Sequence, residues 1–292
     1  MYISPLLTIM LVFFISISKG FGQNIQSLQI SPELATHSDK WGIDINGKQS
    51  DIRLSAFGPY TVTKIDKLDS GAFKSKVKED KEGSYDSKDG YDEYKIRRIE
   101  KNTIFRMSMT GESDSTETVF SAFTATRKKT ETVLGAILSK STSTGGSEIL
   151  NERKQAEGMI IIKNDPTRWS FFIDYPSSSS NVRVISSGIS GYLTNGSDTI
   201  NMNVLYSIVS KKSKDSSSPD QIKMRMPRGV SLINNNDEQI AALVFKQTMA
   251  YIGKKSDSYT NDEMVMINKE MDKSTQLAIA SLYAIMIGLQ GY

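Results

Sequence analysis

Cysteine is absent from this 292-residue chain, and histidine occurs once. Without cysteine the chain forms no disulfide bridge and has no cysteine for a bacterial lipoprotein anchor. With a single histidine, His37, it cannot build a His-based metal site, so zinc and copper chemistry are not expected. We expect His37 to be a solvated residue near the mature N-terminus rather than a catalytic base. Stability must therefore come from an apolar core.

The chain also lacks a large excess of one charge and a long apolar run. Lys and Arg outnumber Asp and Glu by 36 to 33. That balance does not predict the clustered basic surface that nucleic acids require, so we expect no nucleic-acid partner. Both apolar stretches of the chain fall short of the roughly 20 residues that cross a bilayer. We therefore expect no clear transmembrane span in the mature chain.

The first apolar stretch, from Leu6 to Ile17, fits the h-region of a signal peptide. Behind it, Gly20-Phe21-Gly22 provides the small residues that signal peptidase requires, although no Lys or Arg precedes the apolar stretch. We predict a signal peptide over residues 1–22 and a mature N-terminus at Gln23. The sequence thus predicts an exported protein, periplasmic or secreted. An uncleaved anchor is the alternative.

Most of the mature chain consists of short stretches in which apolar and polar residues alternate, as in half-buried β-strands. Two Asn-Gly pairs, at 46–47 and 195–196, stand between such stretches, and each predicts a β-hairpin with a tight turn. Gly58-Pro59 is expected to break the chain before the next strand. We expect strands over residues 41–45, 52–57, 60–65, 94–99, 103–109, 118–126, 159–162, 168–175, 191–194, 199–206, 222–226, 230–233 and 240–245.

Several connections between these strands are long and polar. Those over 74–93, 139–158, 210–220 and 254–263 exceed the four to six residues that are usual in a compact fold. They either cap one end of a barrel or contain helix, and we allow short helices over 130–138 and 147–156. The first connection holds four aspartates, but their spacing differs from that of an EF-hand, so we expect a solvated loop: Asp80, Asp86, Asp89 and Asp92.

The second apolar stretch predicts a helix at about 274–290, which Asp272 or Ser274 can cap. Its apolar residues from Leu277 to Leu289 cover every face, so the helix must be buried on all sides. A membrane anchor and a dimerisation helix are the alternatives. The fold class that follows is mainly β: an antiparallel barrel or strongly curved sheet with a buried hydrophobic C-terminal α-helix, in a single domain over residues 23–292.

This succession of antiparallel strands before one apolar C-terminal helix resembles the tubby-like fold of tubby proteins and phospholipid scramblases. Phe57-Gly58-Pro59-Tyr60 and the strand-turn-strand segment from Ile233 to Phe245 add to the resemblance. It implies a closed barrel wrapped around a central hydrophobic helix. The basic phosphoinositide-contacting positions of that family find no match here, so the resemblance implies no site residue.

No sequence motif indicates a catalytic, cofactor-binding or metal site. Ser75 and Lys78 have Ser-x-x-Lys spacing but lie in a lysine-rich loop, and Gly188-Ile189-Ser190-Gly191 falls short of Gly-x-Ser-x-Gly. No glycine-rich stretch ends as a phosphate-binding loop does. We therefore predict no catalytic residue, cofactor or metal ligand. Carboxylates such as Asp262 and Glu263 stay open as an acid and a base, because such pairs form only in the fold.

We expect core packing for five aromatic residues, and lining of an apolar pocket at a barrel mouth is the alternative: Trp41, Trp169, Phe171, Phe172 and Tyr175. The barrel-like layout and the missing motifs favour a monomeric, exported and non-enzymatic domain with a binding or structural role. Its expected partner is lipid or a small apolar ligand. One alternative is an exported hydrolase whose carboxylates converge only in the fold. The other is an envelope-tethered protein held by its C-terminal helix.

Overall fold

The computed structural model describes residues 26–68, 76–79, 94–131, 147–178, 189–211, 222–245 and 263–289. The chain divides into two compact units. The smaller unit, Met1–Gln29 with Tyr206–Met226, contains β1 (Gln26–Leu28), which pairs antiparallel with residues 207–209. The larger unit is Ile30–Leu205 with Pro227–Tyr292. The leader and the four aspartates of the 74–93 connection lie outside the described residues, and the single domain over 23–292 stays a prediction.

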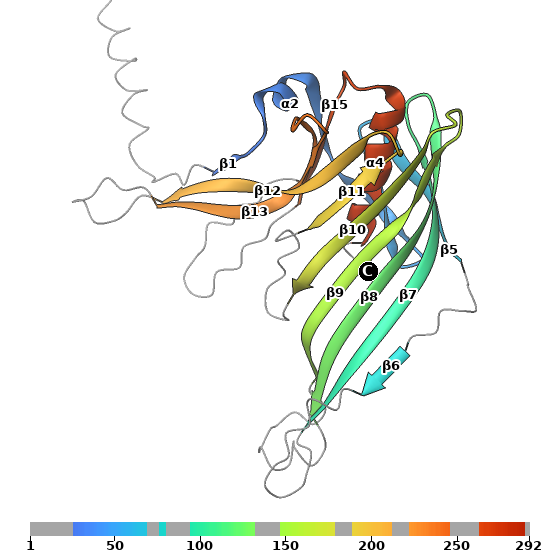
Figure 1. The fold of residues 1–292 in the computed structure, drawn as a ribbon, viewed down its shortest axis with the longest axis vertical. Coiled ribbons are helices and arrows are strands. Elements are labelled where there is room, and N and C mark those ends of the chain that lie inside the picture. Colours follow the sequence, from blue (N-terminus) through green and yellow to red (C-terminus); the bar gives the residue numbers. More distant parts are fainter. Residues whose placement is uncertain are drawn as a thin grey trace, which may run out of the picture. The chain divides into compact units, whose positions relative to one another are not determined.

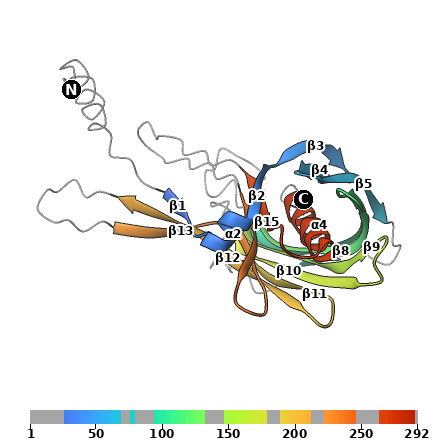
Figure 2. The ribbon, with the colours of Figure 1, turned by 90° about the horizontal axis from the view of Figure 1, so that it is seen from above.

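The larger unit is a nearly closed antiparallel β-barrel (Figures 1 and 2). In the described residues the hydrogen-bonded order of the sheet is β2-β15-β14-β13-β12-β11-β10-β9-β8-β7-β5-β4-β3, and β6 pairs with β7 beside this path. Residues 206–211 of β12 and 222–226 of β13 belong to the smaller unit. The two end strands, β2 and β3, follow each other directly in the chain. The bounds are β2 Ser38–Gly42, β3 Asp44–Gln49, β4 Ile52–Phe57, β5 Tyr60–Leu68, β6 Lys76–Glu79, β7 Tyr94–Thr110, β8 Ser115–Glu131, β9 Ser147–Ile162, β10 Arg168–Ser178, β11 Ser190–Thr194, β12 Thr199–Lys211, β13 Ile222–Ile233, β14 Gln239–Val244 and β15 Met264–Asn268.

The C-terminal helix α4 (Lys273–Leu289) packs against the concave side of this sheet, and Figure 2 shows strands around it. Asp272 caps the helix, because its Oδ1 accepts the backbone N–H of Thr275 at 2.8 Å. Every residue from Gln276 to Leu289 is buried. The expected helix, its cap and its burial on all sides are therefore confirmed.

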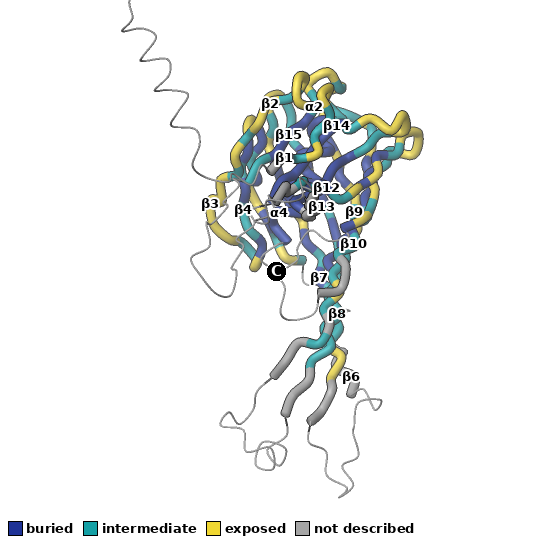
Figure 3. Tube along the Cα trace, turned by 90° about the vertical axis from the view of Figure 1, so that its left-hand side faces the viewer, coloured by how far each residue is buried: buried dark blue, intermediate teal, exposed yellow. Residues whose placement is uncertain are grey.

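Buried residues alternate with more exposed ones along the described central parts of β7 and β8, and the buried residues of β7, β8 and β9 belong to the same core as those of α4. Figure 3 shows how burial is distributed along the chain. Phe105 of β7 and Phe120 of β8 face each other in register and stack with ring centroids 5.3 Å apart. Each is almost fully removed from solvent. Apolar burial of this kind contributes roughly 25 cal/mol per Å² of apolar surface, which makes it the main source of stability in a chain without disulfides.

A few buried polar groups join the helix to its surroundings. The hydroxyls of Ser281 and Thr116 on β8 lie 2.9 Å apart and share a hydrogen bond. The side-chain amide of Gln276 donates to the carbonyl oxygens of Lys269 at 3.1 Å and Met271 at 2.6 Å. These bonds fix the rotation of α4, which its uniformly apolar surface alone would leave weakly defined.

The first expected hairpin has a different turn. Asn46 and Gly47 lie inside β3, where the register with β4 shifts between Ile45 and Gly47 as in a β-bulge. The chain instead reverses at Ser50 and Asp51, whose φ values are 54° and 68°. These values suit a type I′ turn, which small polar residues tolerate. By contrast, the hairpin expected at Asn195-Gly196 is confirmed, because β11 and β12 pair across it.

Other expectations about the strands need correction. The helix allowed over 147–156 is wrong: these residues belong to β9, which pairs with β8 over residues 147–162 and with β10 over residues 152–161. The two strands expected over 94–109 are one, β7. Strand β15 falls just after an expected connection. A short helix, α2 (Pro32–His37), has the signals of a helix start, since Ser31 caps it and proline opens it.

Candidate functional site

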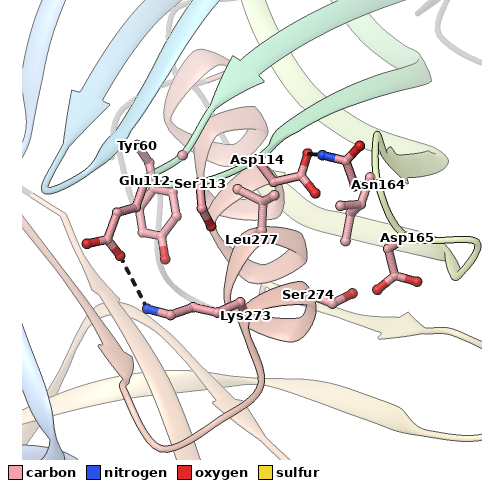
Figure 4. A pocket seen from close by; sticks show the side chains of 11 residues that line it. Tyr60, Glu112, Ser113, Asp114, Asn164, Asp165, Lys273, Ser274 and Leu277 are labelled. Carbon is pink, nitrogen blue, oxygen red and sulfur yellow. Dashed lines mark hydrogen bonds and ion pairs between the residues drawn. The ribbon is translucent and has the colours of Figure 1, made fainter.

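A pocket of about 330 Å³ opens at the end of the barrel where α4 begins (Figure 4). Four segments supply its walls: the start of β5, the β7–β8 turn, the end of β9 with the β9–β10 turn, and the first two turns of α4. We call it the mouth pocket. Its lining residues are Tyr60, Gly111, Glu112, Ser113, Asp114, Ile162, Asn164, Asp165, Lys273, Ser274 and Leu277.

The two turns of the pocket are tied to each other by Asp114. Its Oδ1 accepts the backbone N–H of Ser115 at 2.7 Å and the side-chain amide of Asn164 at 3.1 Å. The backbone N–H of Lys163 also donates to the carbonyl of Ser115 at 3.0 Å. Asp114 therefore has a structural task, because it holds the β7–β8 turn against the β9–β10 turn.

Lys273 and Glu112 form an ion pair across the opening of the pocket. The ammonium nitrogen of Lys273 lies 3.3 Å from Oε2 of Glu112. Both side chains are about 70% exposed, at 71% and 70%. An exposed pair of this kind contributes between about 0 and 1 kcal/mol to stability, so it opens at little cost.

Tyr60 forms one wall of the pocket and is 5% exposed. Its ring meets Trp41 edge-on and Phe57 at a tilt, with centroids 5.7 Å apart in each case. Burial raises the pKa of Tyr60 to about 12, and the charge of Glu112 adds to this shift. Figure 4 shows the hydroxyl directed into the pocket, and among the described residues it has no hydrogen-bond partner.

Asp165 lies on the opposite wall, beside Ser274 (Figure 4). The pKa of Asp165 is below its usual range, first because of the Ser274 hydroxyl and then because of Thr167, whose backbone N–H donates to Oδ1 at 2.7 Å. The Ser274 hydroxyl itself is buried and falls short of full hydrogen-bond geometry with any described group. Asp165 therefore stays ionised, and Ser274 retains hydrogen-bonding capacity.

The acidic residues of the pocket do not form a metal centre. Within the described ranges, no three His, Cys, Asp or Glu side chains are grouped closely enough to hold a metal ion. What the pocket offers is a mixed lining of carboxylates, one ammonium group, neutral hydrogen-bonding groups and the buried apolar surface of Ile162 and Leu277.

The five aromatic candidates do not lie together in this pocket. Trp169 and Phe171 are buried in the core, and Trp41 and Tyr175 pack against it. Phe172 points to the outer face, stacks on Tyr192 and lines a second pocket of about 250 Å³ with Asn102, Ser121, Phe123, Gln155 and Glu157. An apolar pocket lined by the five remains a prediction.

Other residues considered in the sequence have modest roles in the described structure. His37 is on the surface, with Nδ1 2.7 Å from a carboxylate oxygen of Glu270. Of the pair Asp262 and Glu263, Asp262 lies outside the described residues. The sequence signal for the mouth pocket was weak: Gly111-Glu112-Ser113-Asp114 and Asn164-Asp165 have the composition of turns, and only the fold brings them to one end of α4.

None of the helices in the described ranges combines the length and the apolar character that crossing a membrane requires. Comparison with protein-family models, with curated proteins and with solved structures found no match to this chain.

Proposed function

We propose that this chain is an exported, non-enzymatic binding domain whose ligand occupies the mouth pocket. The observation that carries the proposal is the position of Tyr60: its side chain is largely buried, and its hydroxyl is directed into the pocket without a described partner. A phenolic hydroxyl facing a pocket keeps a donor and an acceptor available for a group that enters it. A polar atom of a ligand would supply the missing partner.

The ligand we propose has a polar group and a short apolar part. The inner side of the barrel is occupied by α4, so we place the ligand at the mouth rather than among the strands. There Leu277, Ile162 and the ring of Tyr60 provide the apolar contact that the sequence led us to expect for lipid or a small apolar ligand. Of these two, the size of the pocket favours the small ligand.

A hydrolase is the second candidate, because three carboxylates line one pocket. In such enzymes one carboxyl group serves as a general acid, and its pKa must be raised to keep the proton. The pKa of Asp165 moves in the opposite direction. Asp114 is held by two donors, and Glu112 is exposed and paired with Lys273. These features favour binding over hydrolysis.

A thermal-shift screen of small polar compounds against residues 23–292 tests the proposal. We expect some compounds to raise the melting temperature of the wild type and to lose at least half of this shift in Tyr60→Phe, which removes the hydroxyl and keeps the ring. The matched control is Tyr192→Phe on the outer face, which should keep the full shift. Shifts that survive Tyr60→Phe, or release of product from glycoside and ester substrates, would count against the proposal.

We further propose that the resemblance to the tubby-like fold reflects the same layout, a barrel around a hydrophobic C-terminal helix. Its support is the nearly closed antiparallel barrel with α4 on its concave side. An experimental structure in which α4 lies outside the barrel would contradict it.

Export is tested separately, by N-terminal sequencing of the protein recovered from outside the cytoplasm. A first residue within two positions of Gln23 is expected, whereas a retained Met1 would refute cleavage.

A further inference from the structure

We infer that the mouth pocket takes a positively charged organic ligand: a small ammonium or guanidinium group on a short apolar chain. This inference rests on the proposed function and adds the chemical class of the ligand. It is carried by the charges of the lining, by the position of Lys273 and by the unpartnered hydroxyl of Tyr60.

The lining of the pocket carries more negative than positive charge. Glu112, Asp114 and Asp165 contribute three carboxylates, and Lys273 contributes the one ammonium group among the lining residues. The pKa of Asp165 is lowered by the neighbouring Ser274 and Thr167, so this carboxylate stays charged well below neutral pH. A cation entering the pocket therefore meets an excess of carboxylate oxygens.

Lys273 already shows where an ammonium group can lie. Its Nζ is 3.3 Å from Oε2 of Glu112, at the end of a flexible and largely exposed side chain (Figure 4). The pair is weak because both partners remain in water. The ammonium group of a ligand can therefore displace Lys273 from Glu112, while its chain contacts Leu277 and the Tyr60 hydroxyl accepts a hydrogen bond from it.

The positive end of a helix dipole ordinarily favours an anion, but carboxylates of the protein already lie at the start of α4. Asp272 accepts the backbone N–H of Thr275, and its carboxylate lies at the positive end of the helix dipole. Asp165 adds a second negative charge beside Ser274. An anionic ligand would have to displace or approach these carboxylates, so we expect it to be rejected.

Titration by nuclear magnetic resonance at low salt, with three probes of equal chain length, tests this class. The probes are n-butylammonium, butan-1-ol and butyrate, and the protein is the full mature chain. We expect n-butylammonium to bind at least about fivefold more tightly than butan-1-ol, and butyrate to bind most weakly. Because the contact is ionic, raising the salt concentration should weaken the binding of n-butylammonium and leave the binding of butan-1-ol unchanged.

Two substitutions should change the affinity for n-butylammonium in opposite directions. Glu112→Gln removes a carboxylate and should weaken binding about fivefold, whereas Lys273→Met removes the competing ammonium group and should strengthen it by a similar factor. If the ion pair had only a structural role, both substitutions would change the affinity for n-butylammonium in the same direction. Lys64→Met, which loses a surface lysine paired with Asp66 outside the pocket, is the control for net charge and should have no effect.

The outcomes separate the two proposals. Equal or tighter binding of butan-1-ol or butyrate at the mouth pocket overturns the cationic class and leaves the proposed binding function standing. A lower affinity of Lys273→Met for n-butylammonium overturns the cationic class as well. If all three probes fail to shift the resonances of the mouth pocket and the thermal-shift screen finds no Tyr60-dependent compound, both proposals fall.

Discussion

Burial of tyrosine hydroxyls gives the protein a predictable weakness at high pH. Burial raises the pKa of Tyr60 to about 12, and it raises the pKa values of Tyr175 and Tyr283 as well. In each case the folded state favours the neutral phenol, so the stabilisation is complete below the ordinary pKa of about 10 and is lost as the pH rises through the folded-state value.

We therefore expect the free energy of unfolding to fall as the pH rises from 10 to 12. Tyr60→Phe removes one of the titrating groups and should make this fall shallower, although the hydroxyl was unpartnered and its loss should cost little at pH 8. Urea unfolding of both proteins at pH 8, 10 and 11 measures the slopes. A steeper fall in the variant than in the wild type would show that Tyr60 is not held in its neutral form by the fold.

Gly58 illustrates a close approach that only glycine permits. Its φ is 54°, and a Cβ built on it would lie 2.5 Å from the ring of Trp41. Gly196 also has a positive φ, 95°, but nothing lies within 4 Å of its added Cβ. Substituting each glycine by alanine therefore separates the cost of backbone strain, which both variants share, from the cost of displacing the Trp41 ring, which only the Gly58 variant has.

Gly58→Ala should therefore lower the free energy of unfolding more than Gly196→Ala. Strain in the left-handed region costs each variant about 1 kcal/mol, and displacement of Trp41 adds about 1–2 kcal/mol to Gly58→Ala alone. Chemical denaturation with tryptophan fluorescence reports both the stability and the movement of the ring. Equal losses in the two variants would mean that Trp41 does not rest on Gly58.

The residues also show where sequence reasoning reached its limit. The turn at Asn195-Gly196 could be predicted because glycine readily adopts a positive φ, as Gly196 does at 95°, and strands of matching pattern flank the pair. At Asn46-Gly47 the same pair instead forms a bulge, because the chain reverses later at Ser50 and Asp51. Gly47 and Gly196 both have positive φ values, so the pairing of the flanking strands, and not the Asn-Gly pair itself, decides where the chain reverses.

Among the elements, α4 was the most predictable. Its apolar residues cover every face, and such a helix has no stable place at a protein surface in water. Strand β9 was the least predictable, since its first half, Ser147–Ala156, is polar and rich in residues that favour helix. Pairing with β8 and β10 overrides this preference. The mouth pocket was unpredictable for a related reason: four separate elements build it.

Substitution in α4 tests whether the helix is part of the core. Ala280 is fully buried, so Ala280→Asp places an unpaired charge in the apolar interior and should lower the free energy of unfolding by more than about 4 kcal/mol. Ala35→Asp on the exposed face of α2 is the matched control and should cost no more than about 1 kcal/mol. Circular dichroism during denaturation measures both. If Ala280→Asp left the β-sheet intact with unchanged stability, α4 would not be packed in the barrel.

For the molecule as a whole, the burial of α4 predicts a monomer that needs no detergent. Size-exclusion chromatography of residues 23–292 should give one sharp monomer peak, and truncation before Asp272 should give aggregate, because the inner side of the barrel would lose its apolar filling. A full-length chain that aggregates until detergent is added, together with a truncated chain that stays folded, would instead favour an envelope contact by the helix.

A ligand that completes the hydrogen bonding of Tyr60 in the mouth pocket can be observed directly. The most direct measurement is a crystal structure of the protein with the compound that gives the largest Tyr60-dependent thermal shift. We expect a polar ligand atom at hydrogen-bond distance from the Tyr60 hydroxyl, roughly 2.5–3.0 Å, with the carboxylates of Glu112 and Asp165 facing the ligand. A ligand bound elsewhere, or a Tyr60 hydroxyl paired with a protein group while the pocket stays empty, would contradict the account.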